Sequence, residues 1–384
     1  MKRQLFYLLC IGFLILSSCS PFSPTLPTSV PSEAAQPALT PIPIAQTTAT
    51  QPVVAQKKDI KIESLTVLTH DSFSASEERI ATFEKQNNVK ISFIKGGDAG
   101  AALNRAILSK RSPIADVIYG VDNTFLSRAE SNDVFEAYAS TKLADISNEF
   151  KLSKDNLLSP VDYGDVCINY DKAYFTEKKL VVPQSLEALS KPEYKGLLIV
   201  ENPATSSPGL AFMLATIKDF GIENFLDYWR SLRMNDVLVV NDWETAYYTQ
   251  FSGSSGRGPR PMVVSYGTSP AAEVIFADPK PEEAPTASLV GDNMCFRQVE
   301  FAGILKGTTK RDLAEKFIDF LLDTKFQNDI PMQMFVYPVN KNAVVPAEFK
   351  AFAQVPETPA QLDPLDIAAN REIWIDAWEE AVIQ

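Results

Sequence analysis

Histidine is almost absent from the sequence, since His70 is the only one in 384 residues. Zinc sites of the HExxH type, three-histidine zinc sites and two-histidine iron sites are therefore excluded. A Ser-His-Asp or Cys-His catalytic centre would have to use His70 itself. The GxxxxGK[ST] and GxGxxG motifs of nucleotide-binding loops are also missing. These absences favour a binding function over an enzymatic one.

Positive charge is in deficit, because 36 Lys and Arg residues face 48 Asp and Glu residues, for a net charge of −12. A general nucleic-acid binder needs a basic surface, so nucleic acid is excluded as the expected partner. A hydrophobic content of 45% and a charged content of 22% are typical of a globular protein. The length is sufficient for two lobes of ordinary domain size.

Long apolar runs are lacking too, and the longest near the N-terminus is Leu5–Leu16. A membrane-spanning helix needs ~20 apolar residues, so this run after Lys2 and Arg3 instead predicts a secretory signal peptide over residues 1–18. The following Leu16-Ser17-Ser18-Cys19 is similar to the lipobox of bacterial lipoproteins. We expect a lipid on Cys19; the alternative is ordinary signal cleavage near Ser18.

Residues 19–58 differ in composition from the rest of the chain. They are rich in Pro, Thr, Ser, Ala and Gln, and such a segment cannot bury enough apolar surface to offset the entropy of ordering. Frequent proline keeps it extended. We therefore predict a lipid anchor and a disordered linker before a globular body, with the lipid as the only membrane contact.

Cysteine is scarce in the predicted body, where only Cys167 and Cys295 occur. Both lie in runs typical of strands. Disulfides persist in exported proteins, so the two can form a bridge. Two small buried thiols are an equally ordinary arrangement, and the sequence leaves both open.

The first part of the body alternates between strand and helix patterns. Hydrophobic spacing predicts strands at 65–69, 89–94 and 115–119 and helices at 77–86, 101–110 and from about 123, with Ser76 as a helix N-cap. This βαβαβ order predicts a parallel sheet with helices on both faces.

The same rhythm resumes after Tyr163. Strands are predicted at 197–200, 237–240, 261–265 and 298–304, and helices at 207–217, 224–232, 243–251, 269–276, 313–322 and 365–382. Residues 252–261, rich in Gly, Ser and Pro, predict a surface loop. Ligands of open α/β sheets bind beyond the carboxyl ends of strands, so the polar residues that follow the predicted strands are the candidates for a site.

Eight short motifs at these strand ends carry a family resemblance. In order they are 69–73 (THDSF), 120–123 (GVDN), 160–164 (PVDYG), 169–172 (NYDK), 202–209 (NPATSSPG), 243–247 (WETAY), 265–270 (SYGTSP) and 337–339 (YPV). Together they resemble the thiamine-binding proteins of bacterial ABC importers, from about Leu65 to the C-terminus. The resemblance implies a fold of the α/β class, the two-lobed periplasmic-binding-protein type 2 fold with a ligand cleft between the lobes. We expect lobe 1 to comprise 59–162 and about 298–345, and lobe 2 to comprise 163–297 and the C-terminal helices to 384, with chain crossings near Asp162 and Gln298.

The resemblance also implies ligand contacts. Trp243 and Tyr266 match family positions around a cationic thiazolium ring, and Ser206 matches a phosphate contact. Three residues depart from the family pattern: His70 and Ala272 stand where tyrosine is common, and Phe335 where tryptophan is. The predicted ligand-binding set is His70, Asp71, Asp122, Asn123, Asp162, Tyr163, Ser206, Ser207, Trp243, Tyr247, Tyr266, Ser269 and Phe335.

These residue types suit the chemistry, although each has an ordinary structural alternative. The ring faces of Trp243 and Tyr266 attract an organic cation, but both can equally pack at element ends. The helix opening at Ser206 and Ser207 can hold an anion or simply cap a helix. Carboxylates at strand ends can hold a cation, or serve turns and caps.

The expected protein is a monomeric, non-enzymatic receptor without cofactor or metal, anchored on the outer face of the cell membrane. It would deliver thiamine or a thiamine phosphate to an ABC permease and its cytoplasmic ATPase. A first alternative is an iron(III) receptor of the same fold, in which Tyr247, Tyr266 and His70 supply donors. Tyr247 and Tyr248 fall on a predicted helix, where neighbours diverge. A second alternative is a secreted hydrolase, which the missing GxSxG motif disfavours.

Overall fold

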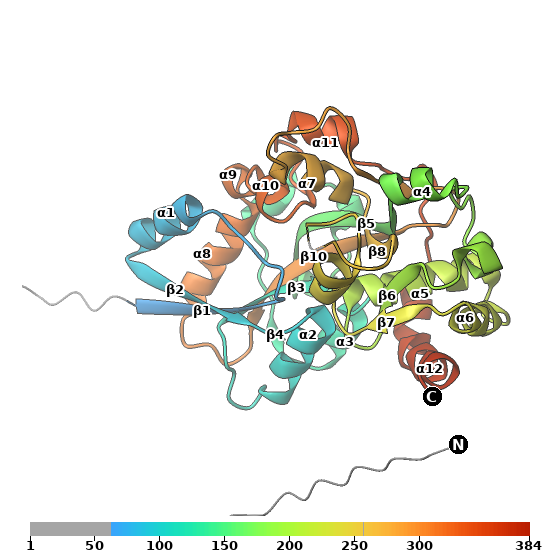
Figure 1. Ribbon diagram of the computed structural model, residues 1–384. Helices are drawn as coiled ribbons and strands as arrows, with labels where there is room; N and C mark the ends of the chain where they lie inside the picture. Colours follow the sequence, from blue (N-terminus) through green and yellow to red (C-terminus); the bar gives the residue numbers. More distant parts are fainter. Residues whose placement is uncertain (1–62, 256) are drawn as a thin grey trace, which may run out of the picture. The chain divides into compact units, whose positions relative to one another are not determined.

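The computed structural model describes residues 63–255 and 257–384. The predicted signal peptide, Cys19 and the linker lie outside the described residues. The described chain folds around a single mixed sheet flanked by helices (Figure 1). Its strands are β1 (Glu63–Thr69), β2 (Val89–Lys95), β3 (Val117–Asp122), β4 (Phe135–Glu136), β5 (Ser159–Asp171), β6 (Leu198–Glu201), β7 (Leu238–Val240), β8 (Met262–Tyr266), β9 (Thr286–Leu289), β10 (Phe296–Leu305) and β11 (Tyr337–Pro338).

The helices are α1 (Glu77–Asn87), α2 (Ala99–Leu108), α3 (Leu126–Ser131), α4 (Lys172–Lys178), α5 (Ser207–Phe220), α6 (Phe225–Met234), α7 (Ser269–Phe276), α8 (Arg311–Leu322), α9 (Thr324–Gln327), α10 (Ile330–Gln333), α11 (Ala347–Phe352) and α12 (Pro364–Val382). The longer helices correspond closely to the predicted ones, whereas the short helices α4, α9, α10 and α11 were not predicted. Ser76 caps α1 as predicted. The helix predicted at 243–251 is a π-helix, η6 (Thr245–Gln250).

Two parallel groups of strands are joined by two long antiparallel ones. The order along the sheet is β2-β1-β3-β10-β5-β8-β6-β7. Strands β1, β2 and β3 are parallel, which confirms the βαβαβ prediction, and β6 is parallel to β7 and β8. Between these groups, β10 runs antiparallel to β3 and β5, and β5 runs antiparallel to β8. Asp162 and Gln298 lie on β5 and β10, while the lobe boundaries stay a prediction.

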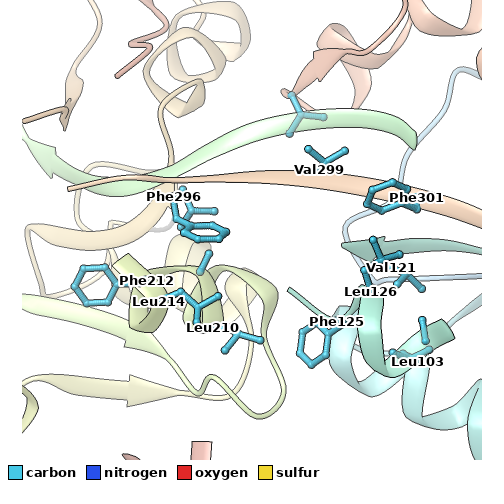
Figure 2. Close-up of a cluster of buried hydrophobic side chains, with 14 of the residues drawn as sticks. Leu103, Val121, Phe125, Leu126, Leu210, Phe212, Leu214, Phe296, Val299 and Phe301 are labelled. Carbon is cyan, nitrogen blue, oxygen red and sulfur yellow. The ribbon is translucent and has the colours of Figure 1, made fainter. Parts of the chain in front are cut away.

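The buried core continues from one parallel group to the other. Side chains of α2, α3, β10 and α5 contribute to one hydrophobic cluster, and Figure 2 shows Phe125, Phe301, Phe296 and Phe212 within it. Helix α5 is buried over most of its length, and α6 packs on both α5 and α12. Burying α5 fixes the position of its N-terminus beside the ends of the parallel strands.

Cys167 on β5 and Cys295, directly before β10, form a disulfide in the structure. The bridge therefore joins the two antiparallel strands that connect the parallel groups. Neither residue has any exposed surface.

Candidate ligand-binding site

A cavity of about 260 Å³ lies at the carboxyl ends of the parallel strands. Residues from just beyond β1, β2, β6, β7 and β8 reach it, as expected for an α/β sheet. Other lining residues come from β10, from η6 and α7, and from the segment before β11. The lining consists of His70, Ser72, Asp98, Ser207, Pro208, Trp243, Tyr247, Tyr248, Ser255, Tyr266, Ser269, Ala272, Glu273, Phe276, Glu300, Met334, Phe335 and Val336.

Aromatic rings form one side of the cavity. Trp243 stacks on Tyr247, with ring centroids 5.1 Å apart and planes inclined by 16°. Tyr248 and Tyr266 meet the indole edge-on, at centroid distances of 5.4 and 6.3 Å. The indole N–H of Trp243 donates to Ser265 Oγ at 2.9 Å, and this hydrogen bond restrains the orientation of the ring. One face of this cluster is thus preassembled to meet a flat or cationic ligand.

The tyrosine hydroxyls in the cavity act as hydrogen-bond donors. Tyr266 donates to Gln298 Oε1 at 2.9 Å, and Tyr247 donates to Glu273 Oε1 at 2.7 Å. Burial, reinforced by nearby carboxylates, raises the pKa of both tyrosines well above the ordinary value. Both phenols are therefore neutral at physiological pH.

Acidic side chains form another part of the wall. Asp98, Glu273 and Glu300 line the cavity, and no lysine or arginine does so among the described residues. Burial raises the pKa of Asp98 and Glu273, and together with the charges of Asp122 and Asp98 it raises the pKa of Glu300 to about 8. A cavity that combines ring faces with carboxyl groups suits a cation better than an anion.

His70 is packed between the cavity and the backbone of β3. Its side chain is buried, its Nε2 lies 3.5 Å from Glu300 Oε2, and its pKa is lowered, chiefly by burial. Gly120 makes this position available, because a Cβ atom there would collide with the imidazole carbon Cδ2. The φ of Gly120 is +98°, a conformation that side chains disfavour.

Comparison with known proteins identifies the family. The profile described as bacterial extracellular solute-binding protein matches residues 112–355. The chain belongs to this family. It is 32% identical to the thiamine-binding periplasmic protein of Salmonella typhimurium over 326 residues, which cover 83% of this chain and 93% of the relative.

Solved structures show the same fold. A periplasmic thiamin-binding protein superposes with a TM-score of 0.73 at 29% identity, covering 83% of this chain and 96% of that one. A ferric-binding protein from Campylobacter jejuni superposes with a TM-score of 0.67 at 19% identity, covering 83% and 99%. The solute-binding protein thus has the predicted periplasmic-binding-protein type 2 fold. None of the helices in its described part is both long and apolar enough to span a membrane.

The structure brings together about half of the predicted site residues of this solute-binding protein. His70, Ser207, Trp243, Tyr247, Tyr266, Ser269 and Phe335 line the cavity. Ala272, noted as a departure from the family pattern, also lines it. Phe335 packs on Phe276 with centroids 4.7 Å apart. Their contact with a ligand stays a prediction.

Asp122 and Ser206 do not line the cavity and instead hold the start of α5 in place. Asp122 has no exposed surface and accepts hydrogen bonds from Thr124 and from the Ser207 hydroxyl. Ser206 is the N-cap of α5, and its side chain accepts from the Gly209 N–H. Capping is thus what the structure shows for Ser206.

The remaining four predicted residues also lie outside the cavity lining. Asn123 bonds to the β10 backbone at Arg297 and Val299. Tyr163 stacks between Phe150 and Tyr337 under the Arg297 guanidinium. Asp71 accepts from the Gly97 N–H at 2.9 Å, and the buried Asp162 accepts from the Tyr119 hydroxyl.

Sequence reasoning missed all three lining carboxylates, which are Asp98, Glu273 on α7 and Glu300. Asp98 caps α2 after a Gly-Gly pair beyond β2, a strand end that was not considered. Glu300 lies inside a strand, but it is an acid within an otherwise largely apolar run, and that pattern was an available signal. The side chains of Tyr247 and Tyr248 were expected to diverge, as neighbours on a helix do. Instead both rings line the cavity from the π-helix, with centroids 5.4 Å apart.

Replacing Asp122 tests its structural assignment. We expect Asp122→Ala to lower the free energy of unfolding by about 2–4 kcal/mol, because buried donors on Thr124 and Ser207 lose their acceptor. The matched Asp71→Ala change removes an exposed carboxylate and should cost less than about 1 kcal/mol. Urea unfolding with unchanged slopes measures both. An Asp122→Ala protein with wild-type stability would contradict the assignment.

Proposed function

We propose that this solute-binding protein is a receptor that captures thiamine or a thiamine phosphate outside the cytoplasm and delivers it to an ABC permease with a cytoplasmic ATPase. The support is twofold. Relatives about 30% identical over most of the chain are named as thiamine-binding proteins, and the cavity has the chemistry that thiamine requires.

The observation that carries the proposal is the pairing of ring faces and carboxyl groups in one cavity. Thiamine has a permanently positive thiazolium ring and an aminopyrimidine ring. A cation over a tryptophan face gains about 0.5–2 kcal/mol, and Trp243 offers such a face beside Tyr266. The carboxyl groups of Asp98 and Glu300 complement the positive charge. The neutral aminopyrimidine can donate to an acceptor such as Glu273.

The phosphate form is less well supported by the hydroxyls of α5. The Ser207 hydroxyl donates to Asp122, and Ser206 caps the helix. An anion at this end would rely on free backbone N–H groups, while Asp98 and Glu300 line the same cavity. We therefore infer that free thiamine binds more tightly than its phosphates.

Two alternatives have weaker support. For iron(III), the phenols of Tyr247 and Tyr266 would have to lose protons that they donate to Glu273 and Gln298. The described residues contain no cluster of three or more His, Cys, Asp or Glu side chains arranged to hold a metal ion.

For hydrolysis, no serine or cysteine hydrogen-bonds to His70 in the described part of the chain, so a nucleophile–base pair is not assembled there.

A ligand panel tests the proposal. Thiamine should raise the melting temperature, because a ligand that binds only the folded state stabilises it by RT ln(1 + [L]/Kd). Thiamine monophosphate should do so less, and ferric citrate should have no effect. Incubated thiamine should be recovered unchanged. Stabilisation by iron alone, or steady turnover of thiamine, would contradict the proposal.

Trp243 is the ring whose loss should matter most. We expect Trp243→Ala to weaken thiamine binding roughly ten- to hundredfold, because stacking and cation–π contact together contribute ~1–3 kcal/mol. Tyr266→Phe keeps the ring and loses a hydroxyl worth ~0.5–1.5 kcal/mol, so it should have a smaller effect. Calorimetry measures both, and circular dichroism confirms folding. Wild-type affinity in a folded Trp243→Ala protein would place the ligand elsewhere.

The anchor is proposed from sequence alone. We expect Cys19 to carry the lipid that tethers a monomeric body to the outer face of the membrane. Cys19→Ala should then move the protein from the membrane fraction to the soluble fraction after cell fractionation. Thiamine affinity should be unchanged in that variant, which separates anchoring from capture. A wild-type protein that is already wholly soluble in its host would contradict the lipoprotein assignment.

A further inference from the structure

Two buried carboxyl groups face each other across the junction of β5 and β10. Asp162 and Glu300 are paired positions in the antiparallel register. Asp162 has no exposed surface, and Glu300 is 8% exposed. Side chains at directly opposed positions lie ~4.5–5.5 Å apart at Cβ, and like charges there are destabilising. The pair therefore cannot carry two full negative charges without a compensating group.

The groups around the pair supply little compensation. Titratable side chains face it from the ends of β1 and β2 and from β3 and β8: His70, Asp98, Tyr119, Asp122 and Tyr266. The Ser207 hydroxyl at the start of helix α5 donates its hydrogen bond to Asp122 and not to the pair. Helix α8 also packs on β10, but its paired residues bond elsewhere, Arg311 to Glu136 and Asp319 to Tyr138.

No lysine or arginine neutralises the Glu300–Asp162 pair in the described part of the chain. His70 is the only cation-forming group in contact with Glu300, and burial lowers its pKa. Lys95 donates to the backbone oxygens of Asp71 and Phe73 instead. Asp162 Oδ1 has no hydrogen-bond donor. Buried acids in such surroundings keep their protons: burial and the charge of Glu300 raise the pKa of Asp162 well above its ordinary value, and the pKa of Glu300 is raised to about 8.

The Glu300–Asp162 pair borders the cavity. Glu300 and His70 line the cavity, and Asp162 lies behind them. We propose that capture is an exchange: a cationic ligand entering the cavity displaces one proton from the Glu300–Asp162 pair to solvent. The cation then supplies the positive charge that the proton had supplied, so the net charge of the site is conserved. This inference rests on the proposed function, since it takes thiamine as the cation.

The sign of the pH dependence follows from this exchange. Below about pH 8 the empty site holds the proton on Glu300, and ligand binding must remove it. A cation within ~4–6 Å lowers the pKa of a carboxyl by about 1–3 units. Affinity should therefore be greatest above about pH 8 and fall as the pH falls, by up to about tenfold per unit for one proton. Acidification would favour release of the ligand.

Calorimetry measures the exchanged proton directly. Thiamine is titrated into the full protein at about pH 7.2 in buffers of different ionisation enthalpy, and the slope of the observed enthalpy gives the protons released. We expect between half a proton and one proton per thiamine, falling toward zero near pH 9. Thiamine that binds with no proton release would overturn the exchange and leave the proposed function standing. A protein that binds no thiamine would overturn both.

Two matched variants locate the proton. Glu300→Gln keeps the shape of the side chain and removes the titrating group, so proton release should disappear and affinity should vary less than threefold between pH 6.5 and 8.5. Glu273→Gln removes a cavity carboxyl outside the cluster, and proton release should persist even if affinity changes. Release lost in Glu273→Gln but retained in Glu300→Gln would overturn the assignment.

A measurement on the ligand-free wild type guards against a variant that fails to fold. Carbon NMR of glutamate carboxyl groups should show one resonance titrating near pH 8 rather than near the ordinary ~4.3 of glutamate. Its absence from spectra of folded Glu300→Gln would assign it; if that variant does not fold, selective line broadening by a small spin label near His70 would do so. A set of glutamates that all titrate below about pH 6 would overturn the proposal.

Discussion

The antiparallel pairing of β5 with β10 is the constraint on which the rest of this structure depends. Among the residues that the structure describes, these two strands are the only link in the sheet order between the β2-β1-β3 group and the β8-β6-β7 group. The disulfide between Cys167 and Cys295 joins the same two strands. The cavity lies where the two groups meet, so its walls come from distant parts of the chain. A change in register between β5 and β10 would move Glu300 away from His70 and Asp162 together.

Local patterns in the sequence were sufficient to predict most elements but not the centre of the sheet. The alternation of strands and helices up to Tyr119 determined a parallel group, because short connections and right-handed crossovers allow few other arrangements. The partners of β5 and β10 were not readable in this way. Strand β5 mixes apolar with acidic and polar residues, and β10 is largely apolar. Neither pattern says which neighbour the strand pairs with or in which direction.

The same distinction explains which site residues could be predicted. Trp243, Tyr266 and Ser269 directly end strands or begin helices at the cavity edge, so topology alone places them there. Asp122 and Asn123 also end a strand, but their side chains meet α5 and β10, elements that are remote in sequence. Strand-end position therefore predicts the neighbourhood of a residue, whereas its role depends on partners that only the fold reveals.

Gly120 gives the site an unusual dependence on a residue that never touches the cavity. Its positive φ and the imidazole packed over its α-carbon leave no space for a Cβ atom. Even alanine at this position would have to distort β3 or displace His70, and His70 is the neighbour of Glu300. We therefore expect position 120 to accept only glycine in this protein, whereas Ala272, which lines the cavity on α7, can be substituted. Substitutions that change the ligand preference of this protein would therefore occur on α7 and not on β3.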